Sequence, residues 1–253
     1  IILSINAIGQ NKHSLAADKA FDSEYYSTAI VKYKKAAKKT KKDRAEKARI
    51  YARIGDCYCM TNKTKSAEIQ YKNAIKQKYA ERDSTVILKY ANTLRYNGKY
   101  EEAKEQYELF LERSPQHPLA IAGIESCRLA EEWTNNPNEV IVTKIKSINS
   151  KQDDFCPAWS DQSYSSIIFT SAREASNGKN TDEWTGQKFS DLYITKCDNK
   201  GKWTEPVSID ENNIINTTGH NMSAESKTAL GEFLIYRTKS LECDFLSVIF
   251  FGF

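Results

Sequence analysis

Residues 67–74 read AEIQYKNA, and this stretch decides the fold of the first half of the chain. It places a small residue first, a tyrosine four positions later and a second small residue three positions after that. The same spacing occurs at residues 29–36, AIVKYKKA, and at residues 103–110, AKEQYELF, where phenylalanine takes the last position. The copies begin 38 and 36 residues apart, and self-similarity at such a period indicates stacked helical repeats. An amphipathic helical bundle without repeats is the alternative.

Apolar residues at helical spacing predict two helices in each copy and one more that closes the stack. The expected ranges are 12–23, 26–40, 45–60, 64–78, 84–97, 100–113 and 118–133. We expect Ala67 to lie where the two helices of its repeat come closest, because only a small side chain allows a short approach. Gly98 separates two helices, since glycine readily adopts the left-handed conformation. The sequence therefore predicts an α-solenoid over residues 11–134.

Further positions strengthen the pattern. Gly55 and Tyr58 precede Ala67 by 12 and 9 residues, and Pro115 follows Ala103 by 12. This arrangement closely resembles the tetratricopeptide repeat. The resemblance implies a concave groove that is lined by the first helix of each repeat and holds a protein or peptide partner.

Side chains spaced by three and four residues share one face of these first helices. In the second repeat the expected groove residues are Arg49, Ala52, Asp56, Cys59 and Met60. In the third they are Thr85, Leu88, Asn92, Arg95 and Tyr96. We expect the partner contact at Arg49, Asp56, Asn92, Arg95 and Tyr96, because arginine grips carboxylates and asparagine pairs with peptide backbone. A groove that binds nothing specific is the alternative.

The composition changes near residue 135. The sequence NNPN at 135–138 is a breaker cluster, and residues 135–150 are expected to form a linker with a first strand at 139–145. Beyond it, short β-type runs follow one another: PAWSD at 157–161, IIFTSAR at 167–173, DLY at 191–193 and GKWTEP at 201–206. Each run is expected to form one strand.

This order of runs resembles the WD40-like β-propeller repeat of bacterial exported proteins, over roughly residues 150–220. The resemblance implies a partial all-β propeller over residues 151–253. Only residues 234–237 resemble a second blade, whereas propellers have about four blades or more. We therefore expect the natural chain to continue beyond residue 253, and Trp159, Phe169, Tyr193 and Trp203 to be partly exposed.

Helical repeats followed by such a propeller are similar to the front half of exported proteins of Bacteroidetes type. Those proteins continue into an OmpA-like peptidoglycan-binding domain, and some belong to the type IX secretion apparatus. The resemblance implies an α + β multidomain, non-enzymatic scaffold in the periplasm, associated with the outer membrane. Contact with peptidoglycan would run through a domain that this sequence lacks. A propeller-based hydrolase or glycan-binding module is the alternative.

Residues 1–10, IILSINAIGQ, resemble the remnant of a secretory signal peptide, with processing after Gly9. Export would permit disulfides among the six cysteines, although free or buried thiols are the simpler expectation. No apolar run reaches the about 18 residues that a membrane-spanning helix needs.

Other chemistries are poorly supported. The three histidines are isolated, and the cysteine spacing matches no zinc site, so we expect no metal, cofactor or catalytic residue. A net charge of +4 is too small to indicate nucleic-acid binding. Residues 32–47 carry nine basic and two acidic side chains. That run indicates either a solvated helix face or a surface for an anionic partner.

Overall fold

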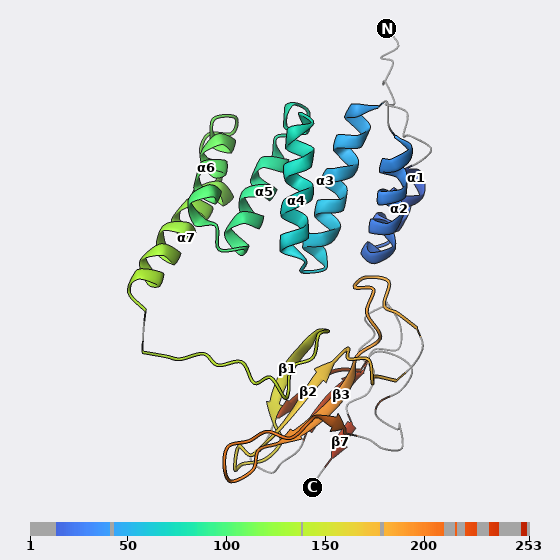
Figure 1. Cartoon of the computed structure of the whole chain (residues 1–253), viewed down its shortest axis with the longest axis vertical. Helices are drawn as coiled ribbons and strands as arrows, with labels where there is room; N and C mark the ends of the chain where they lie inside the picture. The colour runs from blue at the N-terminus through green and yellow to red at the C-terminus, as the bar shows by residue number, and fades with distance from the viewer. Residues whose placement is uncertain are drawn as a thin grey trace. The chain divides into compact units, whose positions relative to one another are not determined.

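The computed structural model describes residues 14–40, 43–137, 139–177, 180–209, 216, 221–226, 233–237 and 249–251. The expected signal remnant at residues 1–10 lies outside this part. The chain divides into two compact units, one made of residues 1–140 with Glu183–Gly186 and the other of the remaining residues. The first unit holds the helices and the second holds the strands (Figure 1). The proposed divisions at residues 11–134, 135–150 and 151–253 stay predictions.

The first unit is a row of helices in which each packs against the next along the chain (Figure 1). The helices are α1 Leu15–Asp22, α2 Tyr26–Lys39, α3 Arg44–Met60, α4 Thr64–Lys76, α5 Thr85–Tyr96, α6 Tyr100–Leu111 and α7 Pro118–Asn135. A short 3₁₀ helix, η1 Tyr79–Glu81, connects α4 to α5. All seven expected helices are present in the described part, and they form hairpins similar to tetratricopeptide repeats.

Local chemistry sets several helix ends. The Asp43 carboxylate accepts a hydrogen bond from the Glu46 backbone N–H over 2.9 Å and so caps the start of α3. Pro118 occupies the first turn of α7, where its missing N–H costs nothing. Gly98 has φ +78° between α5 and α6, as the turn there requires.

The repeated positions form the core of the helical unit. All nine are at most 2% exposed: Ala29, Tyr33, Ala36, Ala67, Tyr71, Ala74, Ala103, Tyr107 and Phe110. Ala67 is fully buried, and its expected place at the closest approach of the two helices stays a prediction. Two tyrosine rings lie directly against helical glycines. A Cβ added to Gly55 would lie 2.6 Å from Cε1 of Tyr71, and one added to Gly123 would lie 2.3 Å from Cζ of Tyr107.

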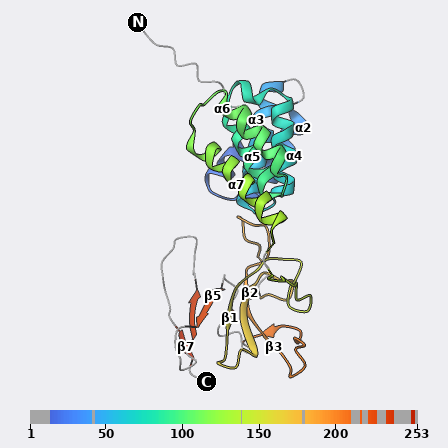
Figure 2. The ribbon, with the colours of Figure 1, turned by 90° about the vertical axis from the view of Figure 1, so that its left-hand side faces the viewer.

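The second unit contains two antiparallel sheets. The first has the order β1-β2-β3-β4, with bounds β1 Asp154–Trp159, β2 Ser166–Ser171, β3 Asp191–Lys196 and β4 Val207–Ser208. The second has the order β5-β6-β7, with bounds β5 Asn221–Ser226, β6 Phe233–Arg237 and β7 Ile249–Phe251. Figure 2 shows β1, β2 and β3 together and β5 and β7 beside them. The first three expected runs overlap β1, β2 and β3, but residues 201–206 form no strand, and the fourth strand is the short β4 that follows them. Neither described sheet closes into a propeller.

Two expectations for this unit are wrong. Residues 139–145 form no strand, and Val140, Ile141 and Val142 are 71%, 89% and 93% exposed. A β-branched run forms a strand only where it can pair with a neighbouring strand and pack against an apolar face. No described strand pairs with residues 139–145. Phe169 and Tyr193 are buried rather than partly exposed, whereas Trp159 is 42% exposed as expected.

Arg173 explains part of this burial. Its guanidinium lies 5.1 Å from the ring centroid of Phe169 and 4.6 Å from that of Tyr193. It also pairs with Asp154 over 3.1 Å, so its charge is compensated while its plane covers both rings. Strand β5 lies near β1, β2 and β3 and adds a second layer.

We predict that Gly55→Ala destabilises the helical unit by about 2 kcal/mol, because the new methyl group overpacks the Tyr71 ring. This loss would exceed the gain of about 1 kcal/mol that alanine brings to a helix. Urea unfolding followed by helical circular dichroism measures the change. In a Tyr71→Leu background the cost of Gly55→Ala should fall, since the ring is gone. Equal costs in both backgrounds would contradict the packing described.

Candidate functional site

The tyrosines of the repeats bind back to the first helix of their own hairpin. Each hydroxyl donates a hydrogen bond to a polar residue 15 positions earlier. The pairs are Tyr33 with Asp18 at 2.6 Å, Tyr71 with Asp56 at 2.9 Å, and Tyr107 with Asn92 at 2.6 Å. We call these three pairs the tyrosine ladder. They place a polar group at the same point of α1, α3 and α5.

In the first pair of the ladder, which we call its first rung, Asp18 of α1 carries a negative charge that Arg49 of α3 compensates. Its guanidinium lies 2.9 Å from Asp18 and 2.8 Å from Glu46, and it donates to the Ser14 hydroxyl over 3.0 Å. The three charged side chains are 16%, 8% and 12% exposed, so this is a largely buried cluster. The donors of Arg49 are therefore used within the fold. That Arg49 contacts a partner stays a prediction. Its guanidinium already donates hydrogen bonds to Glu46, Asp18 and Ser14 within the fold.

The cluster shifts the acid–base equilibria of its members. Burial alone would raise the pKa of Asp18 and of Glu46, but hydrogen bonds from Arg49 and its charge outweigh burial and hold both pKa values below their ordinary range. The hydrogen bond to Glu46 raises the pKa of Arg49 further, against the effect of burial. All three groups are thus charged at neutral pH.

In the second rung, Asp56 is also compensated. Lys89 of α5 lies 2.8 Å from its carboxylate, and Arg53 lies 3.8 Å from it. The Cys59 sulfur lies 3.6 Å from the Tyr71 hydroxyl at the same place. Asp56 therefore joins α3, α4 and α5.

The third rung differs, because its polar residue is the neutral Asn92. Arg95 donates from Nε to the Tyr107 hydroxyl over 3.2 Å, and its guanidinium lies 4.8 Å from the ring centroid of Tyr96. Burial acts against the charged form, yet contact with Tyr107 leaves the pKa of Arg95 raised. Tyr96 itself is 68% exposed. Within the described part of the chain, Arg95 forms no ion pair, so its terminal nitrogens are open to a ligand.

The structure thus separates the predicted site residues into two groups. Asn92, Arg95 and Tyr96 lie together on α5 with unused donors. Arg49 belongs to a largely buried ion-pair cluster, and Asp56 pairs with the partly exposed Lys89 and Arg53. The sequence did not reveal the ion pairs of Asp18 and Lys89, nor the hydrogen bonds that the tyrosine hydroxyls donate. The constant separation of 15 residues between each motif tyrosine and its polar partner was the signal that could have found the ladder.

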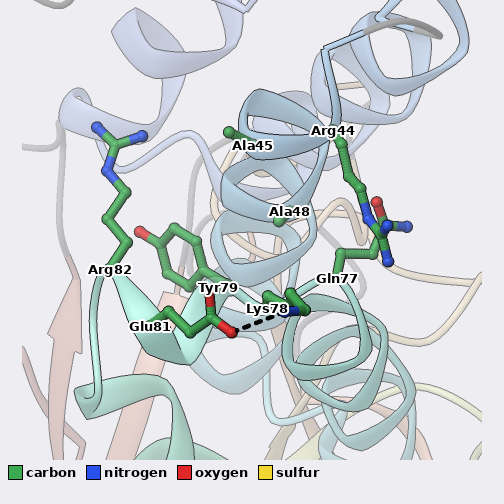
Figure 3. A pocket seen from close by; sticks show the side chains of 8 residues that line it. All are labelled: Arg44, Ala45, Ala48, Gln77, Lys78, Tyr79, Glu81 and Arg82. Atoms are coloured by element: carbon green, nitrogen blue, oxygen red, sulfur yellow. Dashed lines mark ion pairs between the residues drawn. The ribbon is translucent and has the colours of Figure 1, made fainter.

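A pocket of about 400 Å³ lies at the other end of the second hairpin (Figure 3). Its walls come from the start of α3, the end of α4 and the turn at η1. They include Arg44, Gln77, Lys78, Tyr79 and Arg82. Lys78 pairs with Glu81 over 3.2 Å. Sequence reasoning included Arg44 only as part of the basic run and did not foresee the pocket.

The described part of the chain holds thiols but no cluster of metal ligands. Five cysteines there carry free thiols: Cys57, Cys59, Cys127, Cys156 and Cys197. Burial raises the pKa of Cys57 to about 12, so this thiol is inert at neutral pH. Among the described residues, no three His, Cys, Asp or Glu side chains are grouped to hold a metal ion. No helix among them is long and apolar enough to cross a membrane.

No protein-family model matches this chain, and no curated protein matches it. Among solved structures it is similar to the Sgt2 TPR domain from Aspergillus fumigatus, with a TM-score of 0.40 and 18% sequence identity. The similarity covers 53% of this chain and 87% of that chain. The likeness is distant, and the tetratricopeptide-like character of the hairpins is visible in their own packing.

We predict that Arg49→Met lowers the free energy of unfolding by about 2–3 kcal/mol at pH 7, because two buried carboxylates lose their counter-ion. In the wild type both folded pKa values lie below the unfolded values of about 4, so this stability is present above pH 5 and is lost as pH falls through the folded values. In the variant, burial is opposed only by the hydrogen bonds from Tyr33 and Ser14 and by the charge of Arg53, so the folded pKa values of Asp18 and Glu46 are higher than in the wild type.

As pH falls, the wild type therefore loses more stability than the variant, and the difference in unfolding free energy between the two proteins narrows below about pH 5. Urea unfolding across this pH range measures it. Arg128→Met, which removes two exposed ion pairs on α7, is the control and should cost under about 1 kcal/mol at every pH. Identical behaviour of the two variants would contradict the buried cluster.

Proposed function

We propose that the chain is a non-enzymatic scaffold that holds an extended segment of a protein partner on the exposed face of α5. The observation that supports this most is the state of Arg95. Its Nε is held by the Tyr107 hydroxyl, and its plane is stacked on Tyr96. A guanidinium held in this way loses little conformational entropy when it binds a carboxylate with two hydrogen bonds.

Asn92 and Tyr96 complete the proposed contact. The Asn92 carbonyl oxygen accepts from Tyr107, which points its amide nitrogen away from the ladder and leaves it to donate to a peptide carbonyl. The exposed Tyr96 ring offers a flat apolar surface one turn away from Asn92. Together they suit an extended peptide with an acidic side chain.

We also propose that this scaffold acts in the bacterial cell envelope, after export, as part of an outer-membrane or periplasmic assembly such as type IX secretion. The first sheet would be one blade of a WD40-like propeller. The four-strand order at residues 154–208 and the signal-like residues 1–10 support the proposal. Cell fractionation tests it: the protein should be recovered with outer-membrane or periplasmic material, and recovery in the cytoplasm alone would contradict it.

A second candidate is glycan binding by the strand unit. Trp159 and Tyr164 are 42% and 65% exposed, and their rings meet edge to face with centroids 5.5 Å apart. Trp203 lies 6.2 Å from Trp159 between centroids. Exposed aromatic rings of this kind can stack on sugar rings. Binding of the chain to a glycan array, and its loss in Trp159→Ala, would favour this candidate over a purely protein-binding role.

We predict that a photo-crosslinking amino acid, p-benzoylphenylalanine, placed at Tyr96 forms an adduct with a partner protein in extracts of the cells that make this chain. The same amino acid at Leu109, a partly exposed position on α6, is the control and should form little adduct. Adding Arg95→Gln to the Tyr96 probe should lower the adduct yield about tenfold, since a charge-assisted contact is lost. Equal yields at both probe positions would contradict the proposed face.

A further inference from the structure

The pocket at the start of α3 is a second candidate binding site, made of residues that the face of α5 does not use. Figure 3 shows Arg44 with Gln77 on one side and Arg82 with Tyr79 on the other. Lys78, at φ +66°, lies between them and pairs with Glu81. With three basic side chains and one acidic one, the wall is positively charged.

The arginines of the pocket differ from the other arginines of the chain. Every other arginine with a described side chain has a polar partner. These partners are Asp18 and Glu46 for Arg49, Asp56 for Arg53, Tyr107 for Arg95, the Ala80 carbonyl for Arg113, Glu125 and Glu132 for Arg128, and Asp154 for Arg173. Arg44 and Arg82 have no such partner among the described residues, and both line the pocket.

The floor between these arginines is apolar. Ala48 is buried, and Ala45 and the ring of Tyr79 extend the same surface. Pockets of a few hundred Å³ that combine an apolar floor with a few charged groups are typical of ligand sites. A ligand that fits here carries negative charge at its ends and an apolar group between them.

The surrounding charge favours the same kind of ligand. Lys38 and Lys39, at the end of α2, are exposed and precede Arg44 by a few residues in the chain. A basic surface beside a cationic pocket raises the local concentration of acidic ligands and their association rate. The positive charge of residues 32–47 would then attract an acidic partner toward this pocket.

We propose that this pocket binds an acidic segment of a protein partner. Two carboxylates of the segment pair with Arg44 and Arg82, and an apolar side chain between them rests on Ala48 and Tyr79. The two guanidinium groups lie on opposite sides of the pocket (Figure 3), so spaced carboxylates reach both, whereas a single phosphate reaches one. The proposal rests on the scaffold function above but assigns it a second contact on different residues.

A fluorescein-labelled peptide, Gly-Glu-Glu-Leu-Glu-Glu-Gly, tests the proposal by fluorescence anisotropy with the full chain. A peptide with glutamine in place of every glutamate is the ligand control. We expect Arg44→Gln/Arg82→Gln to weaken binding of the acidic peptide at least about tenfold, because two charge-assisted contacts are lost. Arg44→Lys/Arg82→Lys should weaken it less, since the charge remains and only the paired hydrogen bonds are lost.

Lys19→Gln/Lys65→Gln is the matched protein control. It removes the same charge from two exposed lysines on α1 and α4 that form no ion pair with a described residue, and it should bind like the wild type. An equal loss of binding in this control would show a diffuse charge effect and overturn the proposal. Equal binding of the glutamine peptide, or displacement of the acidic peptide by inorganic phosphate at matched ionic strength, would also overturn it.

The same assay separates this site from the face of α5. We expect Asn92→Ala/Arg95→Ala to weaken binding of the acidic peptide less than Arg44→Gln/Arg82→Gln does, because the face of α5 offers one guanidinium and the pocket offers two. If that variant loses the peptide and the pocket variant retains it, the acids bind on α5: the pocket proposal is then wrong, while the scaffold function stands. If no form of the chain binds the peptide, the pocket proposal is again wrong, and crosslinking at Tyr96 decides the scaffold function independently.

Discussion

The helical unit depends on tyrosine side chains that cross from the second helix of each hairpin to the first. Each ring fills the space between helices, and each hydroxyl reaches a polar atom 15 residues earlier in the chain. A buried hydroxyl without a partner would cost about 1–3 kcal/mol, so the polar residue at that place is as necessary as the ring. Burial raises the pKa of Tyr33 and of Tyr71 and keeps both hydroxyls protonated as donors.

The same requirement explains how charge is distributed along the tyrosine ladder. An aspartate in the ladder brings a negative charge into a half-buried position, and a cation from the next hairpin compensates it. Arg49 does so for Asp18, and Lys89 does so for Asp56. The third rung uses Asn92 and needs no cation. Arg95, held beside it, is therefore left with donors that the fold does not use.

In the strand unit, one arginine links buried rings to a buried acid, whereas the helical unit uses several tyrosines for its links. Arg173 covers the rings of Phe169 and Tyr193 and pairs with Asp154. Burial would raise the pKa of Asp154, but hydrogen bonds from Ser171 and Ser150 lower it and keep the carboxylate charged. Asn216 adds a further link, because its amide bonds both the N–H and the carbonyl of Leu192 at 2.9 Å. One buried ion pair and one buried amide thus stabilise the first sheet.

The sequence by itself determined the features that depend on neighbours along the chain. The spacing at residues 67–74 and its two copies predicted the seven helices, because helical periodicity and breakers such as Gly98 act locally. The β-type runs predicted β1, β2 and β3, whereas the fourth run, residues 201–206, forms no strand. Spacing placed Asn92, Arg95 and Tyr96 on one helix, α5, and their role in binding stays a prediction.

Tertiary structure decided what depends on residues far apart. Asp18 and Arg49 are 31 positions apart, and no local rule pairs them. Likewise, residues 139–145 have the composition of a strand, but no neighbouring strand receives them, and Arg44 and Arg82 share a pocket only because α3 packs against α4 and η1. Charge pairing, strand pairing and pocket formation all depend on distances in space, which periodicity along a chain does not contain.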